Sequence, residues 1–276
     1  MGNMRACIAV ALLALAACGS DHSKVDASII IPDTAVDAKV WMDAPPSMYD
    51  LTCFGGTAPT TAADPITIAG STQTLTQQGP EAVGMVLVEV FKTGTVNPVA
   101  TVTSDAAGAF ITGNIATGGT PLDGFLRGAK ATFRTSYLYP PSPATASLAG
   151  VPLLVVSNQA FTLLSTQLAM VTQDDTNNGA LVVAVTDCST PPTPIDGATL
   201  KVQQSGTDVG TIFDLGAIAA QAAGTFFVFN VPDGPTQLLV SFDGKDFPVR
   251  TVVAHKKPNG MNAEGTMTVT AVRPGP

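Results

Sequence analysis

The chain has 276 residues, of which 45% are hydrophobic and only 12% are charged. Its 26 glycines and 21 prolines predict many turns, a profile typical of β-rich extracytoplasmic proteins and too hydrophobic for wholesale disorder. The formal net charge is −8, and the 13 Lys and Arg residues do not cluster beyond Lys256-Lys257. Because such an acidic chain repels phosphate backbones, we expect no nucleic-acid partner.

Residues 1–17 carry one positive charge, at Arg5, and then a short apolar run that ends in small residues. The run is shorter than the roughly 20 residues that cross a ~30 Å membrane core, and it predicts a secretory signal peptide. It closes on Leu15-Ala16-Ala17-Cys18, which resembles the bacterial lipobox. The resemblance implies that the Cys18 thiol takes acyl lipid and anchors the chain in a bilayer. Gly19 resembles the residue that follows the cysteine in outer-membrane lipoproteins. The alternative is an ordinary signal peptide cut near Ala17.

Residues 18–52 are predicted to form the lipid anchor and a disordered acidic linker. The linker is rich in Ala, Ser and Pro and has little apolar mass to bury. Its aspartates do not follow the Asp-x-Asp-x-Asp-Gly pattern of calcium loops, so we interpret them as solvated charges. They are Asp21, Asp26, Asp33, Asp37, Asp43 and Asp50.

Residues 53–156 are predicted to form a first β module. Short runs rich in β-branched residues are separated by Gly, Pro, Asn and Asp turns, at a spacing typical of a sandwich. The runs are residues 66–68, 85–91, 99–103, 109–112, 129–133, 137–139 and 152–156.

The most specific motif of this module is the stretch from Val99 to Phe110. We expect Asp105 to cap a turn, Gly108 to adopt a positive φ and Phe110 to return to the core. Together with Pro121-Leu-Asp-Gly124 and the run at 137–141, this stretch resembles the carboxypeptidase regulatory-like, transthyretin-like family of small β-sandwiches. In that family the sandwich accompanies a zinc peptidase, but no peptidase is attached here.

Tyr137 and Tyr139 are two apart on a predicted strand and therefore share one face. Two aromatic rings on a β face could form a sugar-stacking ligand surface. The alternative is a half-buried pair packed beside Pro140-Pro141, which the usual burial of tyrosine favours.

Residues 157–178 are predicted to form a helical connector. Phe161, Leu164, Leu168 and Val171 recur at helical spacing, and Ser157 or Asn158 can cap the first turn. The oxygen-rich run at 174–178 that follows could bind a cation, but a helix stop and strand-entry turn explains it more simply.

Residues 179–276 are predicted to form a second β-sandwich. Seven runs read as strands: residues 180–185, 199–203, 209–213, 225–231, 237–242, 249–254 and 266–272. Threonine alternates in the last run, so we expect one wet and one packed face. Ile195-Asp-Gly197 and Asn230–Pro235 resemble the same family. The predicted fold is therefore all-β: two tandem antiparallel Ig/transthyretin-like sandwiches, one short connecting helix and a disordered N-terminal tether.

Two cysteines remain after Cys7 leaves with the signal peptide and Cys18 takes lipid. In an oxidising compartment, Cys53 and Cys188 predict a disulfide between the first module and the second. The alternative is two separately buried thiols, because the sequence does not show whether the two Cα atoms lie within ~7 Å.

Motifs that carry chemistry are missing from the sequence. Two histidines, His22 and His255, are too few for the three protein ligands of a catalytic zinc, and there is no Walker A, Gly-x-Ser-x-Gly or Cys-x-x-Cys motif. We therefore predict no metal, cofactor or enzymatic activity. The sequence favours an outer-membrane lipoprotein that acts as an envelope interaction or structural module with an unknown partner. The alternatives are a glycan-binding module and an accessory subunit of an envelope enzyme.

Overall fold

The computed structural model describes residues 48–76, 79–217, 222–257 and 265–275. The predicted signal peptide, Cys18 and the linker up to residue 47 lie outside the described residues. The strands within them are β1 (Ile68–Thr76), β2 (Gly79–Ala82), β3 (Leu87–Lys92), β4 (Ala100–Thr103), β5 (Ala109–Ile111), β6 (Gly124–Ala129), β7 (Thr135–Tyr139), β8 (Leu148–Leu154), β9 (Asn178–Val185), β10 (Thr199–Gln204), β11 (Thr207–Asp208), β12 (Thr211–Asp214), β13 (Thr225–Pro232), β14 (Gly234–Phe242), β15 (Lys245–Asp246), β16 (Arg250–Ala254) and β17 (Thr266–Val272). Helix α1 (Asn158–Thr162) continues into the π-helical turn η1 (Leu163–Leu168).

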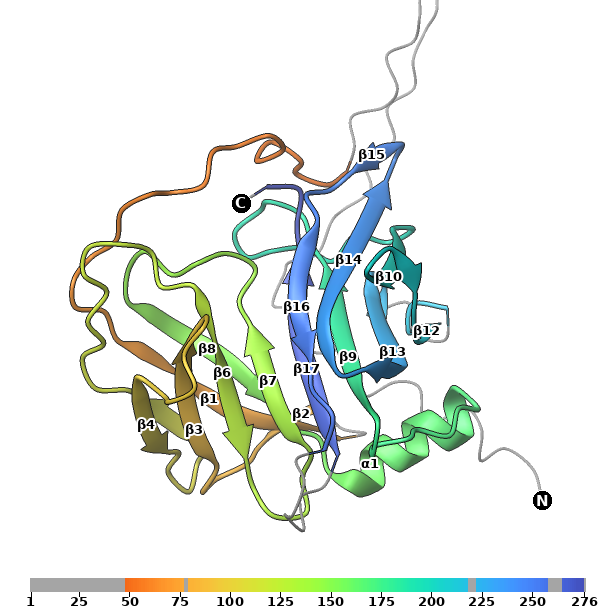
Figure 1. Cartoon of the computed structure of the whole chain (residues 1–276), viewed down its shortest axis with the longest axis horizontal. Coiled ribbons are helices and arrows are strands. Elements are labelled where there is room, and N and C mark those ends of the chain that lie inside the picture. Colours follow the sequence, from red (N-terminus) through yellow and green to blue (C-terminus); the bar gives the residue numbers. More distant parts are fainter. Residues whose placement is uncertain (1–47, 77–78, 218–221, 258–264, 276) are drawn as a thin grey trace, which may run out of the picture.

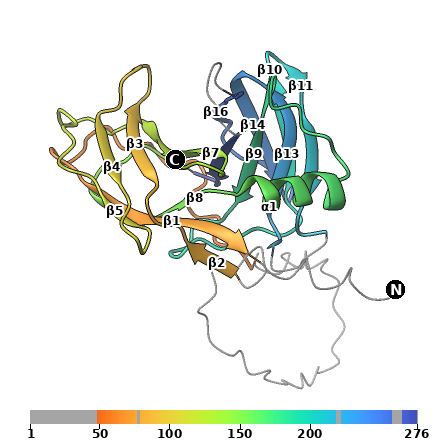
Figure 2. The ribbon, with the colours of Figure 1, turned by 90° about the horizontal axis from the view of Figure 1, so that it is seen from below.

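The strands form three sheets. A central sheet runs β12-β13-β9-β17-β7-β6-β3-β4. A first outer sheet joins β1 to β2, β5 and β8, and a second outer sheet joins β10, β11, β14, β15 and β16. Figure 2 shows the two outer sheets apart from each other, with β1, β2 and β5 at the lower left and β10 and β11 at the upper right, each over a different part of the central sheet. We call the first outer sheet together with β7, β6, β3 and β4 the first sandwich. The second outer sheet together with β12, β13 and β9 is the second sandwich.

The outer sheets cover opposite faces of the central sheet, as the side chains of β7 show. Leu138 packs against the first hydrophobic core, whereas its neighbours Tyr137 and Tyr139 belong to the second core. Successive side chains on a strand point to opposite faces, so β7 touches both cores. Helix α1 covers the central sheet on the face opposite the second core, where Phe161 packs against Phe227 and Phe229.

Strand β17 joins the two halves into one sheet. It pairs in parallel with β9 of the second sandwich and with β7 of the first (Figure 1). The all-β fold with sandwiches and one short helix is confirmed. The modules are not simply antiparallel units in tandem, however, because the last strand is hydrogen-bonded to both.

The expectation that β17 has one wet face is wrong. Thr266, Thr268 and Thr270 are at most 3% exposed. Their hydroxyls donate to backbone carbonyl oxygens: Thr266 to His255, Thr268 to Val253 at 2.8 Å and Thr270 to Tyr139 at 3.0 Å. A threonine whose hydroxyl is hydrogen-bonded can be buried at little cost. The alternation therefore marks one buried face lined by threonines and one partly buried apolar face.

Local predictions from the sequence hold at the helix and at the first-sandwich turn. The Ser157 side chain accepts a hydrogen bond from the Ala160 N–H at the start of α1. The Asp105 carboxylate accepts from the N–H groups of Ala107 and Ala109, Gly108 has a φ of 81°, and Phe110 is buried. One predicted strand is misplaced, because residues 124–129 form β6 where the sequence favoured 129–133. No helix among the described residues is long and apolar enough to cross a membrane.

Candidate functional site

The first described residues lie against the second sandwich, although the first sandwich follows them in sequence. We call residues 49–54 the N-terminal arm. Tyr49 packs edge-on against Phe242 with ring centroids 5.4 Å apart, and its hydroxyl accepts from the Asp196 N–H at 3.0 Å. Further along, the ring of Phe54 lies 6.4 Å from that of Phe247. The arm is therefore packed on the core of the second sandwich.

A disulfide between Cys53 and Cys188 fixes the arm covalently. The two Cα atoms are 5.7 Å apart and the cysteines are separated by 135 positions in the sequence. The predicted bond is thus present, and the alternative of two separate thiols is wrong. Next to it, the Cys188 N–H donates to the Asp50 carbonyl at 2.8 Å, as in a short strand pairing. Cys53, at the start of the predicted first module, is therefore bonded to a residue that follows β9 of the second sandwich, as predicted.

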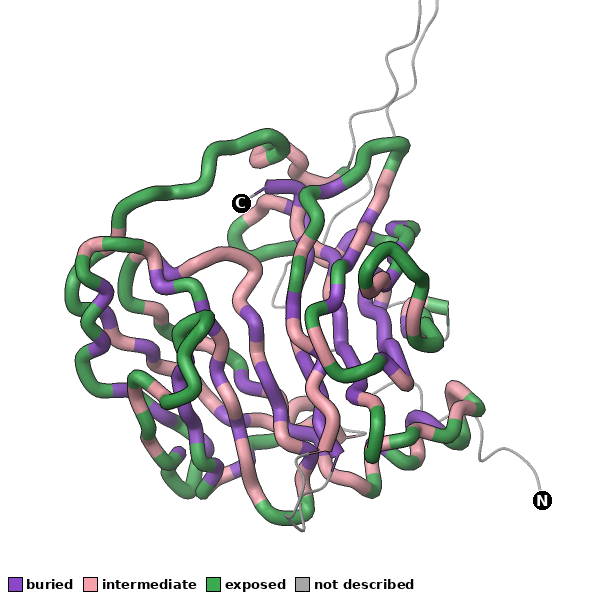
Figure 3. The backbone as a smooth tube through the Cα atoms, viewed as in Figure 1, coloured by how far each residue is buried: buried purple, intermediate pink, exposed green. Residues whose placement is uncertain are grey.

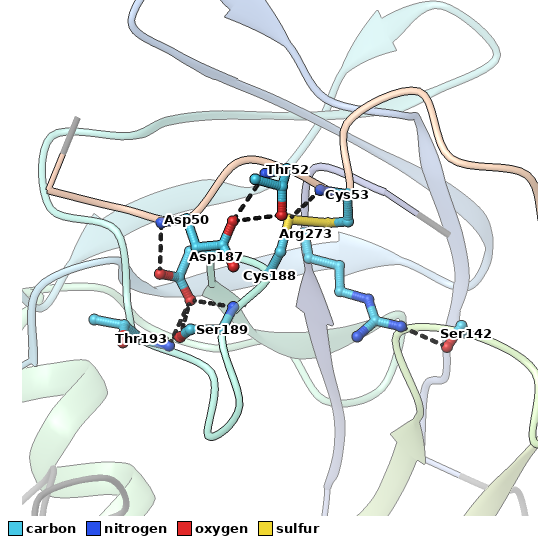
Figure 4. Close-up of a disulfide and its surroundings, with 9 residues drawn as sticks. All are labelled: Asp50, Thr52, Cys53, Ser142, Asp187, Cys188, Ser189, Thr193 and Arg273. Carbon is cyan, nitrogen blue, oxygen red and sulfur yellow. Dashed lines mark hydrogen bonds between the residues drawn. A yellow bond between two sulfur atoms is a disulfide. The ribbon is translucent and has the colours of Figure 1, made fainter. Parts of the chain in front are cut away.

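Asp187 organises the loop that receives the arm (Figure 4). Its carboxylate is 3% exposed and accepts from the Asp50 N–H at 3.1 Å, the Ser189 hydroxyl at 2.6 Å and the Thr193 N–H at 2.8 Å. Burial raises the pKa of Asp187, but the hydrogen bonds from Ser189, Thr193 and Asp50 outweigh it and leave the pKa below its ordinary value. This role could not be recognised in the sequence, because an aspartate before a cysteine has no distinctive pattern.

The C-terminal end of the described chain reaches the same place. A side chain added at Gly275 would collide with the backbone of Cys53, so a larger residue here would require the backbone to move. Nearby, the Arg273 guanidinium donates to the Ser142 hydroxyl at 2.8 Å. We call the arm, the disulfide and the 187–193 loop the clasp. It brings together both ends of the described chain and the loop after β9.

The predicted ligand surface at Tyr137 and Tyr139 is wrong, because the side chains are not accessible. They are 6% and 7% exposed. Tyr139 stacks on Phe125 with ring centroids 5.0 Å apart, and Tyr137 stacks on His255 at 3.7 Å. A sugar needs a free ring face, and these faces are taken by other rings of the protein. The favoured alternative of packed tyrosines is the one that the structure supports.

His255 forms part of this packing between the central sheet and β16. Its Nε2 lies 3.3 Å from the Tyr139 hydroxyl, and burial lowers the pKa of His255 to about 4. The imidazole is therefore neutral at pH 7. Burial also raises the pKa of Tyr139, which keeps the phenol protonated. Because both groups stay uncharged and are covered by aromatic rings, they serve as packing elements.

A shallow groove of about 670 Å³ lies at the edge of the first sandwich, between β1, β4 and β5. Val102, Phe110 and Ile111 line it, with Asp105 as the one charged residue. The Asp105 carboxylate already caps the 105–108 turn. Ile111 is 63% exposed. The groove can make apolar contacts, and no set of polar groups converges on it.

The part of the chain that the structure describes contains no metal-binding site. No group of three His, Cys, Asp or Glu side chains there could hold a metal ion. Asp174, from the oxygen-rich run, caps its own turn instead: its carboxylate accepts from the Thr176 N–H at 3.0 Å and from the Asn177 side chain at 2.8 Å. This agrees with a turn and not with a cation site.

Comparison with known proteins gives no family for this chain. No family model matches the sequence, and no curated protein matches it. Among solved structures, the minor pilin GBS52 of Streptococcus agalactiae is 8% identical over 75% of this chain and 95% of that one, with a TM-score of 0.25. A shaft pilin of Lactobacillus rhamnosus GG is 10% identical over 78% and 99%, with a TM-score of 0.22. The BSP domain of a biofilm-associated protein is 14% identical over 71% of this chain and 30% of that chain, with a TM-score of 0.21.

Proposed function

We propose that the protein is a non-enzymatic lipoprotein of the bacterial cell envelope, held at the outer membrane by acyl chains on Cys18. In this proposal the two sandwiches, which resemble carboxypeptidase regulatory-like domains, form an interaction or structural module at the end of the acidic linker. The observation that carries the proposal is the clasp. A chain that is anchored through its N-terminus needs a firm junction between the linker and the folded body, and Cys53–Cys188 supplies one.

Two ion pairs among the described residues support a structural role. Arg127 pairs with Glu89 at 2.5 Å on the central sheet. Arg134 pairs with Asp175 beneath helix α1, with its guanidinium 3.6 Å from the centre of the Phe161 ring. Groups that are paired and packed in this way stabilise a fold and are poorly placed for acid-base or nucleophilic chemistry.

The proposal is tested by labelling the protein with an alkyne fatty acid in a Gram-negative host, followed by membrane fractionation and intact-mass measurement. We expect the wild type to be labelled, to sediment with outer membranes and to begin at Cys18. The Cys18→Ser variant should lose the label and leave the membrane fraction. Cys7→Ser is the matched control, because this cysteine lies inside the predicted signal peptide and its loss should change neither result. An unlabelled wild-type protein with a free N-terminus near Ala17 would overturn the proposal.

A second candidate is an accessory subunit of a separate envelope enzyme, and the groove with its exposed Ile111 favours it. A photo-crosslinking residue at Ile111 should then join the protein to one enzyme, whereas the same residue at Val96, which is 91% exposed and does not line the groove, should not. Equal crosslinking from both positions would exclude this role for the groove. The glycan-binding alternative is not supported at Tyr137 and Tyr139, because both side chains are buried.

A further inference from the structure

The disulfide attaches the N-terminal arm to the second sandwich, although the first sandwich follows the arm in sequence. The contacts described for the arm go to the second sandwich and to the 187–196 loops: Tyr49 to Phe242 and Asp196, Asp50 to Asp187 and Cys188, and Phe54 to Phe247. Residues 55–61, which follow, are exposed and cross to the first sandwich along the surface (Figure 3). The chain joins the first sandwich only where the Ala62 and Ala63 N–H groups donate to Gly119 and Thr145.

As a result, the first sandwich lies within a covalent loop of the chain that begins and ends at the second sandwich. Cys53 and Cys188 bracket all of it together with helix α1 and strand β9, and the bond brings both ends of this stretch to one point. The shortest covalent path from the arm to the rest of the molecule runs through the disulfide into the 186–188 turn and β9. Strand β9 is paired on both edges, with β13 and with β17.

We propose that the clasp is the force-bearing attachment of the folded body: tension on the N-terminal linker enters the second sandwich through Cys188 and bypasses the first sandwich. The disulfide takes the tension because the parallel route through residues 55–61 is longer and stays slack. Strand β9 spreads the tension over two neighbouring strands in the middle of the central sheet. The first sandwich, with its apolar groove, is thereby presented to a partner without bearing the tension of the anchor. This inference deepens the proposed function, since it assumes that the linker is attached to the envelope.

The inference can be tested on the soluble protein without lipid, so that its failure is distinct from failure of the membrane anchor. A protease site replaces residues 56–60 in the exposed crossing, and single molecules are pulled between a handle before residue 48 and a handle at the C-terminus. We expect cut and uncut oxidised molecules to unfold at the same force and with the same gain in length. Force would then not pass through residues 55–61.

The matched control is the Cys53→Ser/Cys188→Ser variant of the same protein. Uncut, it should extend further by about 470 Å, because about 135 additional residues at ~3.5 Å each are no longer held by the bond. Cut, it should lose the connection at low force, since only the non-covalent arm contacts remain. A cut oxidised protein that separates, or that unfolds at a lower force than the uncut one, would overturn the proposal.

Discussion

Replacing both cysteines of the clasp by serine should destabilise the protein by about 5 kcal/mol. The bond closes a loop of 135 residues, and in the chain-entropy model such a loop removes about 17 cal/mol/K from the unfolded ensemble, or about 5 kcal/mol at 25 °C. Domains are typically stable by only about 5–15 kcal/mol. The Cys53→Ser/Cys188→Ser variant should therefore lose a third or more of its stability.

Urea denaturation of the oxidised wild type and of the double variant, followed by far-UV circular dichroism, measures this loss. We expect a lower midpoint and a somewhat larger dependence on urea, because the uncrosslinked chain exposes more surface when unfolded. Ser189→Ala is the control: it keeps the disulfide and removes one hydrogen bond to Asp187, so it should cost only about 1 kcal/mol.

A loss below about 1 kcal/mol in the double variant would refute this reasoning. It would mean that the two ends of the loop stay together in the unfolded chain without the bond, so that closing them costs no entropy. A loss well above about 5 kcal/mol would also contradict it, because the bond would then stabilise the native state directly and not through the unfolded ensemble.

Three further predictions concern buried groups elsewhere. The pKa of His255 is about 4 in the folded protein against an ordinary 6.5, so the unfolded chain binds the proton more readily. The stability should therefore fall as the pH drops from about 6.5 to 4. Thermal melts should show this fall in melting temperature in the wild type and not in His255→Phe. Arg134→Met should cost about 2–3 kcal/mol in urea denaturation, because Asp175 loses its partner; an unchanged midpoint would contradict this. Tyr139→Phe should cost about 1–2 kcal/mol, since the hydroxyl contacts His255 at 3.3 Å and also hydrogen-bonds to the Val253 backbone. Tyr139→Ala should cost about 3–5 kcal/mol because it also leaves a cavity; equal losses would show that the hydroxyl matters more than the ring.

Features fixed by neighbours in sequence could be predicted from the sequence. The Asp105–Gly108 turn and the Ser157 cap each depend on residues within four positions of one another. Strand β6 was missed because its two glycines lower the strand propensity of the run. The structure shows why one of them is needed: a Cβ at Gly124 would collide with the backbone carbonyl of Phe91 on the paired strand β3.

The arrangement of the two halves could not be predicted, because it depends on contacts between distant segments. The threonines of β17 have the pattern of a strand with one wet face, and only the carbonyl oxygens of Val253 and Tyr139 make them fit a buried position. The arm is a similar case. Its sequence belongs to the end of an acidic linker, yet Asp187 and Cys188 hold it from 135 or more positions away. Both segments join parts that the sequence pattern assigns to separate modules. The predicted division, with a first module ending at residue 156 and a second beginning at 179, therefore separates β7 from β17, which the structure pairs. The second sandwich is consequently built from the N-terminal arm and the C-terminal part of the chain, with the first sandwich inserted between them.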